Sequence, residues 1–304
     1  MMRDWFLVMV ALLSSSTAAM AGEENISIEP GIARNVGKTL EGRKIAPPPL
    51  RTRGNDLEGL YRASVYNVAV ILTEGALGSS AVISVKPDHR ALLITNQHVV
   101  QNSFTLKGQP SVVVLFYDAA LKNESFEGQR FGDCLASSRD QSLWCQAVRQ
   151  CTRIGTVVRT DESRDLALVS VAKAPQSVIG FQAGNLNRLQ PGSSVAAIGH
   201  PKGLLWSFTT GIISAIRSHF LLGKGFGTLV QTQTPLNPGN SGGPLIGMDG
   251  TVAGIVFGAN AGERVRFGSE ELTIPPEGLN YAIGIDTVLA FTNGPTNARE
   301  SPGR

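Results

Sequence analysis

Short apolar runs rich in β-branched residues fall into two groups along this chain of 304 residues, with Pro191-Gly192 between them. Such runs, bounded by Gly, Pro and polar residues, are typical of strands. The first group is Val68–Leu72, Ala81–Val85, Leu92–Thr95, Val112–Phe116 and Leu166–Val171; the second is Val195–Ile198, Phe208–Ile216, Leu229–Thr232, Val252–Phe257 and Tyr281–Ile285. Two groups of about six strands predict an all-β fold with two six-stranded antiparallel β-barrels, over about residues 60–180 and 185–285.

Helical patterns are short and lie at the edges of the strand-rich region. Asp56 begins a short candidate helix that ends near Arg62, and Asp286–Phe291 predicts a short C-terminal helix. The polar segment Asp118–Arg153 fits neither pattern. Since loops of that length are usually functional or disordered, we interpret it as an irregular insertion in the first barrel.

The N-terminus has the pattern of a secretory signal. Arg3 precedes the apolar run Trp5–Leu13, and Ala19-Met20-Ala21 fits a cleavage site before Gly22. We therefore expect residues 1–21 to be a signal peptide that exports the chain to the periplasm or out of the cell. The apolar run is too short to be a stable membrane span.

Two further segments fall outside the strand pattern. Residues 22–55 contain Pro47-Pro48-Pro49 and no strong periodicity, which indicates an extended N-terminal arm. Residues 292–304 are polar and are expected to form a disordered tail. These boundaries leave residues 56–291 as the folded domain.

Charge and cysteine content narrow the class of function. The net charge of +3 is too small to indicate binding to nucleic acid or to a membrane surface. Cys134, Cys145 and Cys151 fall in one segment, so export would allow one disulfide and leave one thiol, with three pairings open. No histidine lies near them to complete a zinc site. We expect no metal and no cofactor.

A serine between glycines is the candidate nucleophile. Ser241 lies in Gly239–Leu245, where glycines permit unusual backbone dihedrals and close approach of a substrate. Such a serine becomes reactive only when folding brings a histidine base and a carboxylate to it. His98 follows a strand-to-turn pattern, and Asp165 directly precedes an apolar strand. The chain order is histidine, aspartate, serine, at separations of 67 and 76 residues (165 − 98 and 241 − 165).

The remaining histidines compete with His98 for the role of base. None of His89, His200 and His219 lies in the same strand-to-turn pattern as His98. We interpret them as surface or structural residues.

The segments Thr95–Val100, Asp165–Val169 and Asn237–Gly243 resemble the three signature blocks of the chymotrypsin-fold serine proteases, and of the HtrA branch in particular. The similarity spans about Val65–Ile285. It implies that Ser241 attacks the scissile carbonyl, His98 acts as base, Asp165 orients the imidazole, and the N–H groups of Gly239 and Ser241 form the oxyanion hole. The chain would then be an exported serine endopeptidase that acts on protein or peptide substrates through an acyl-enzyme.

The chain departs from the trypsin pattern at three places. Asn240 stands where trypsin-like relatives carry the aspartate that captures a new N-terminus on zymogen cleavage, so that activation is not expected. Pro235 stands where they carry the aspartate of the S1 pocket. A small or aliphatic residue before the scissile bond (P1) is therefore predicted, with Phe257, Gly258 and Ala259 as pocket walls. Only 19 residues (304 − 285) follow Ile285, too few for the PDZ module that HtrA proteins usually carry.

Two other functions use the same residues. A proteolytically silent binding or chaperone-like module could retain the fold, and the same machinery could hydrolyse esters or another acyl compound. Covalent labelling of Ser241 separates an enzyme from a binding module, and an unfolded protein substrate separates a protease from an esterase.

Overall fold

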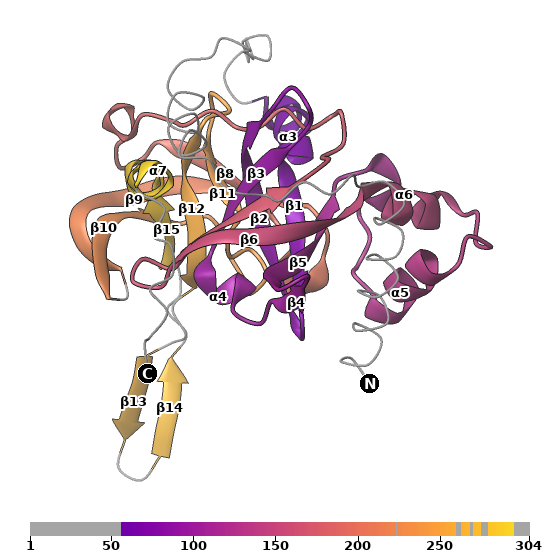
Figure 1. The fold of residues 1–304 in the computed structure, drawn as a ribbon. Helices are drawn as coiled ribbons and strands as arrows, with labels where there is room; N and C mark the ends of the chain where they lie inside the picture. The colour runs from indigo at the N-terminus through magenta and orange to yellow at the C-terminus, as the bar shows by residue number, and fades with distance from the viewer. Residues whose placement is uncertain (1–55, 223, 260–262, 268–269, 275–278, 295–304) are drawn as a thin grey trace, which may run out of the picture.

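Two barrels of antiparallel strands make up most of the described chain (Figure 1). The structure is a computed structural model that describes residues 56–222, 224–259, 263–267, 270–274 and 279–294. The predicted signal peptide, the N-terminal arm and residues 295–304 of the predicted tail lie outside the described residues. No helix of the described part is long and apolar enough to cross a membrane.

The first barrel is built on a sheet in the order β1-β2-β3-β7-β6-β5-β4, closed by antiparallel pairing of β1 with β5. The closing register aligns Ala69 with Phe116. Six strands thus form the barrel, and β4 extends the sheet beyond β5. The strands are β1 (Val68–Thr73), β2 (Ala76–Val85), β3 (Ala91–Thr95), β4 (Phe104–Leu106), β5 (Gln109–Phe116), β6 (Thr152–Asp161) and β7 (Leu166–Val171).

The second barrel closes in the order β10-β15-β12-β11-β8-β9. Its strands are β8 (Ser194–Gly199), β9 (Ser207–Leu222), β10 (Gly225–Thr232), β11 (Pro244–Gly247), β12 (Val252–Ala259) and β15 (Asn280–Gly284). A separate two-stranded sheet pairs β13 (Glu263–Phe267) with β14 (Glu270–Ile274). The prediction of two six-stranded antiparallel barrels is confirmed.

Short helices connect and flank the barrels. They are α3 (Leu57–Ser64), α4 (Gln97–Val100), α5 (Gly128–Ala136), α6 (Leu143–Cys151) and α7 (Ile285–Asn293), with single turns of 3₁₀ helix at Val65–Asn67, Ala119–Leu121, Leu186–Arg188 and Pro201–Gly203. The C-terminal helix is present as predicted, and it extends to Asn293, two residues into the predicted tail. The Asp56 carboxylate caps α3 by accepting a hydrogen bond from Gly59 N–H, as the sequence indicates.

The interpretation of Asp118–Arg153 as irregular is wrong. This insertion between β5 and β6 folds into α5 and α6, beside the first barrel (Figure 1). A disulfide between Cys134 and Cys145 joins the two helices. The Arg149 guanidinium donates hydrogen bonds to the carbonyls of Cys134 and Ser137 at the end of α5. These tertiary contacts hold helices for which the local sequence gives a weak pattern.

Trp206 links the two barrels at their interface. The residue lies between β8 and β9 of the second barrel, is 2 % exposed, and donates from Nε1 to the Val68 carbonyl of β1 at 2.9 Å. Its ring meets Tyr117 and His200 edge to face. The interface therefore combines apolar burial with a directed hydrogen bond.

We expect Trp206→Phe to destabilise the fold more than Trp144→Phe does. Both changes shrink a buried indole, but Trp206→Phe also leaves the buried Val68 carbonyl without its donor, which costs about 1–3 kcal/mol. Trp144 Nε1 has no partner among the described residues, so its loss removes an unpaired donor. Urea titration of both variants measures the free energy of unfolding. Equal losses would show that the hydrogen bond of Trp206 does not hold the barrels together.

Candidate active site

His98 stands at the start of the short helix α4, directly after β3. Asn96 precedes α4 in extended conformation, and the apolar residues Val99 and Val100 are buried. His98 thereby faces outward, and its side chain is 46 % exposed. Its Nδ1 lies 2.7 Å from Asp165 Oδ2, and its backbone N–H donates to Asp165 Oδ1 at 2.9 Å. The sequence pattern of buried strand, turn and exposed histidine is realised as predicted.

Asp165 is held in the turn between β6 and β7. Its backbone has φ of +55°, a left-handed conformation that Asp tolerates better than most residues. Its carbonyl accepts a hydrogen bond from Asn96 Nδ2 at 2.9 Å. Because both carboxylate oxygens and the carbonyl are engaged by residues 96 and 98, the turn and the histidine are fixed relative to each other.

Asp161 organises the same turn from its other end. It accepts hydrogen bonds from the Ser163 hydroxyl and N–H and from Arg164. Partial burial acts to raise the pKa of Asp161, but these hydrogen bonds and the charge of Arg164 outweigh it and lower the pKa. The turn that presents Asp165 therefore has its own anchor, independent of His98.

Ser241 lies in the loop between β10 and β11. The residue is 8 % exposed, and its carbonyl accepts a hydrogen bond from Ser79 N–H of β2 at 2.8 Å. The next residue, Gly242, has φ of +86° and donates to the Val256 carbonyl of β12. The loop is thus fixed to both barrels at Ser241 and Gly242.

Gly242 also places the Ser241 loop against the strand that leads to His98. A Cβ atom on Gly242 would clash with the Ser79 carbonyl oxygen and the Thr95 hydroxyl, so only glycine fits. Thr95 is the last residue of β3 and precedes His98 by three. The structure therefore packs the Ser241 loop against the end of β3, three residues before His98. Within the described residues, the Ser241 hydroxyl makes no hydrogen bond.

Two backbone donors of the loop are unpaired. Gly239 has φ of +102°, and neither its N–H nor that of Ser241 donates to any group in the described parts of the chain. Ser241 is buried and Gly239 is half-buried, and most buried backbone N–H groups in proteins are paired. Two such donors two residues apart, beside a serine hydroxyl, suit an oxygen that carries negative charge.

The residues assigned to substrate specificity are described in part. Phe257 is half-buried at the end of β12, whereas the side chains of Gly258 and Ala259 lie outside the described residues. Pro235 is exposed between the buried residues Thr234 and Leu236. Asn240 is 4 % exposed, and its amide nitrogen has no partner among the described residues.

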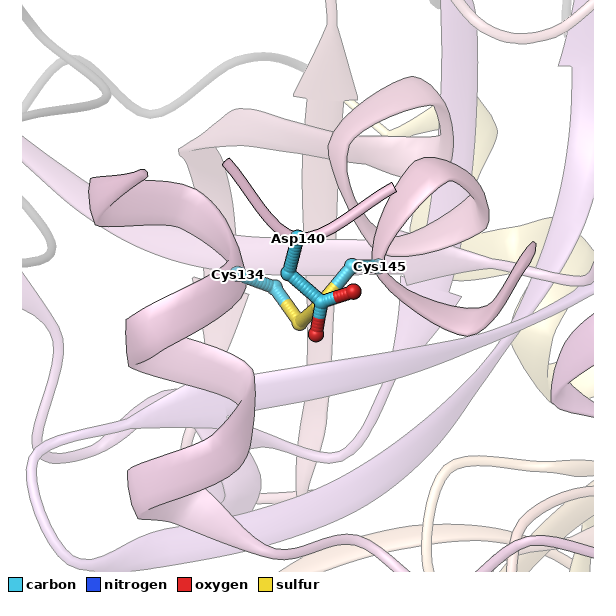
Figure 2. Close-up of side chains that lie close together, drawn as sticks. All are labelled: Cys134, Asp140 and Cys145. Atoms are coloured by element: carbon cyan, nitrogen blue, oxygen red, sulfur yellow. A yellow bond between two sulfur atoms is a disulfide. The ribbon is translucent and has the colours of Figure 1, made fainter. Parts of the chain in front are cut away.

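The cysteine pairing that the sequence left open is Cys134 with Cys145. Figure 2 shows Asp140 over this disulfide, with Oδ2 at 3.2 Å from Cys145 Sγ. Because both sulfurs are consumed in the disulfide, they offer no thiolates to a metal. Cys151 is a buried free cysteine, and burial raises the pKa of its thiol to about 11. That thiol stays protonated and unreactive at neutral pH.

The competing histidines have other partners, and none of them pairs with a carboxylate in the described residues as His98 does. His200 is fully buried and contacts Ser79, and the exposed His219 stacks on Phe226. His89 lies near the β2–β3 turn, where its carbonyl accepts a hydrogen bond from Ala174 N–H. The Ser79–His200 contact was missed in the sequence, because 121 residues separate the pair and only the packing of two strands from different barrels joins it.

Comparisons with known proteins identify the family of this chain. The family described as "Trypsin-like peptidase domain" matches residues 78–255, more than half of the chain. A probable periplasmic serine endoprotease, DegP-like, of Marinomonas sp. is 38 % identical over 102 residues, which are 34 % of this chain and 21 % of that protein. Serine protease HTRA1B of Danio rerio is 31 % identical over 202 residues, 64 % of this chain and 32 % of that protein. The chain thus spans a fifth to a third of the length of these relatives.

A solved structure described as "HtrA-type protease AlgW with tripeptide" superposes with a TM-score of 0.49 at 22 % identity. The superposition covers 77 % of this chain and 62 % of that one.

The glycine at position 242 gives a stability prediction. Gly242→Ala and Gly192→Ala both place a Cβ on a residue with positive φ, which costs about 1–2 kcal/mol. Only position 242 also lacks space, because nothing lies within 4 Å of a Cβ at Gly192. We expect Gly242→Ala to lower the free energy of unfolding by clearly more than Gly192→Ala, as measured by urea denaturation. The same loss in both variants would contradict the close packing of the Ser241 loop on β2 and β3.

Proposed function

We propose that this chain, which belongs to the trypsin-like peptidase family, is a serine endopeptidase that cleaves peptide bonds through an acyl-enzyme. The observation that carries the proposal is the doubly bonded His98–Asp165 pair together with the Ser241 loop, which packs against the end of β3 before His98 and offers two unpaired N–H groups. In this assignment Ser241 is the nucleophile, His98 the general base and acid, and Asp165 the residue that orients the imidazole.

The His98–Asp165 contact sets the direction of proton transfer. Asp165 Oδ2 can only accept, so the neutral imidazole carries its proton on Nδ1 and leaves the lone pair of Nε2 free. Nε2 takes the proton of the Ser241 hydroxyl as its oxygen bonds to the substrate carbonyl carbon. The imidazolium then gives that proton to the leaving amine as the C–N bond breaks. Water repeats the sequence on the acyl-enzyme and releases the acid and free Ser241.

The N–H groups of Gly239 and Ser241 would bind the oxygen that becomes negative in the tetrahedral intermediate. Their lack of partners in the described structure supports this role, since a donor already bonded within the protein would have to be released first. Each such donor is typically worth about 10²–10³ in rate.

For specificity we propose a small or aliphatic P1 residue. Position 235, six residues before the nucleophile, holds a proline in place of a carboxylate, and Phe257 is half-buried at the end of β12. A cationic P1 side chain would lose its hydration there without gaining an ion pair. Gly258 and Ala259 complete the proposed pocket.

For cellular setting we propose export, with residues 1–21 as signal peptide, residues 22–55 as an arm, and residues 56–291 as the protease domain that acts on protein or peptide substrates. The Cys134–Cys145 disulfide supports this setting, because disulfides persist mainly in oxidising compartments. Asn240 cannot form the ion pair of zymogen activation, so we propose that cleavage of the N-terminus does not switch on this site.

A fluorophosphonate probe tests the activated nucleophile. We expect the purified protein to be labelled at Ser241 and Ser241→Ala to remain unlabelled. Asp165→Asn should react slower by on the order of 10⁴, because the imidazole loses the acceptor that fixes its tautomer. Asp133→Asn, on the exposed face of α5, is the matched control and should react at the normal rate.

A folded protein that the probe never labels would overturn the assignment in favour of a silent binding module. Unfolded casein then separates the remaining classes. Cleavage of casein, lost in Ser241→Ala, supports an endopeptidase, and labelling without any cleavage would indicate an esterase.

Peptide libraries test the P1 proposal. We expect kcat/KM for Ala or Val at P1 to exceed that for Arg or Lys at least tenfold, because an unpaired buried charge costs more than about 1.4 kcal/mol, the equivalent of that factor. Mass spectrometry of the cleaved peptides gives the profile. Dominant cleavage after Arg or Lys would contradict the proposed pocket.

A further inference from the structure

A second serine–histidine pair packs against the Ser241 loop. The backbone N–H of Ser79 donates to the Ser241 carbonyl, but among the described residues the side chains of the pair make no hydrogen bond to Ser241 or His98. Ser79 on β2 and His200 after β8 are both fully buried, and Ser79 Oγ lies 2.8 Å from His200 Nδ1. The same Ser79 hydroxyl donates to the Gly239 carbonyl at 2.7 Å. The chain of contacts therefore runs from His200 through Ser79 to Gly239, whose N–H is one of the two proposed oxyanion donors.

The protons of this chain have one consistent arrangement. Ser79 has a single hydroxyl proton, and the Gly239 carbonyl can only accept, so that proton belongs to the Ser79–Gly239 bond. His200 must then donate from Nδ1–H to Ser79 Oγ. Burial lowers the pKa of the His200 imidazole to about 3, which keeps the ring neutral with one proton to place.

Hydrogen bonds fix both carbonyls that flank the Gly239 N–H. The Pro238 carbonyl accepts from Lys202 N–H at 2.8 Å, and the Gly239 carbonyl accepts from Ser79. In a planar trans peptide the C=O and N–H point in opposite directions. The bond from Lys202 therefore turns the Gly239 N–H away from the residues 201–203 turn, and the bond from Ser79 fixes the next peptide.

These bonds are needed because glycine does not fix its own backbone. Glycine adopts positive and negative φ about equally well, so φ of +102° at Gly239 leaves the peptide free to turn over unless contacts prevent it. A side chain would not help, because a Cβ on Gly239 would clash with the His200 carbonyl. The orientation of the donor is thus set by its neighbours.

We propose that Ser79 and His200 are positioning residues that hold the Gly239–Asn240 peptide. Together with the Lys202 bond to the preceding peptide, they restrain both sides of Gly239 and keep its N–H directed at the oxyanion of the reacting substrate. The inference rests on the proposed serine endopeptidase function and adds two residues to it. Neither touches the substrate, and each acts through the carbonyl of Gly239. Their contribution appears in the transition state, where the carbonyl oxygen becomes negative, and much less in substrate binding.

Ser79→Ala tests the proposal, with Ser80→Ala as matched control. Ser80 is also fully buried and donates to a backbone carbonyl, but to Ala69 of β1, away from the loop. We expect Ser79→Ala to lower kcat on a peptide substrate at least tenfold, up to the about 10²–10³-fold loss of an oxyanion donor, with KM changed less than twofold. Ser80→Ala should keep kcat, whatever it does to the free energy of unfolding.

A pair of variants at position 200 tests the donor. His200→Leu removes Nδ1–H and should lower kcat like Ser79→Ala. His200→Asn places an amide nitrogen near the position of Nδ1 and should restore part of that loss. If Leu and Asn give the same kcat at equal stability, His200 serves only to fill space.

The outcomes separate this inference from the proposed function. If the wild type is not labelled by the fluorophosphonate probe, the endopeptidase proposal fails. If the wild type is labelled and Ser79→Ala, folded by circular dichroism, keeps full kcat, the function stands and the positioning role is wrong. A loss of kcat that Ser80→Ala reproduces at equal loss of stability would also overturn it.

Discussion

The hydrogen bond from Ser79 N–H to the Ser241 carbonyl is the contact on which the site depends, because it joins the two barrels at the nucleophile. His98 and Asp165 belong to the first barrel, and Ser241 belongs to the second. No local segment of the chain links Ser241 to the other two residues, so the packing between the barrels determines their relative position. Trp206 secures the same interface farther from the site through its bond to Val68.

The glycines of the Ser241 loop follow from this contact. The loop lies so close to β2 and β3 at this point that a Cβ on Gly242 would clash with the Ser79 carbonyl oxygen and the Thr95 hydroxyl. The loop gains two positive-φ residues at 239 and 242, and with them the freedom to turn its peptides over. Hydrogen bonds restrict this freedom: Lys202 N–H donates to the Pro238 carbonyl, and the Ser79 hydroxyl donates to the Gly239 carbonyl.

The sequence was sufficient for the barrels and for the members of the proposed site that lie on strongly patterned segments. Runs such as Leu166–Val171 are buried strands in the structure because apolar β-branched residues leave few alternatives. The helix α5 could not be predicted in the same way. It contains Gly128 and Gly132, and it buries only Phe131 and Cys134, so its helical state depends on the disulfide and on contacts with α6. Ser142, which caps α6 by accepting from Cys145 N–H, was a local signal that could have been used.

The cysteine pairing and the Ser79–His200 contact needed the structure for a different reason, since both are facts of register and packing. Ser79 and His200 are 121 residues apart, and no local rule couples a residue of β2 to one that follows β8. The imidazoles of His98 and His200 thus differ in exposure and in hydrogen-bond partners. His98 is half exposed, and its Nδ1 lies beside the carboxylate of Asp165. His200 is buried against the Trp206 ring and the Ser79 hydroxyl, and burial lowers its pKa so that the imidazole stays neutral. It can therefore donate a hydrogen bond from Nδ1 to Ser79, but it cannot exchange a proton with a substrate.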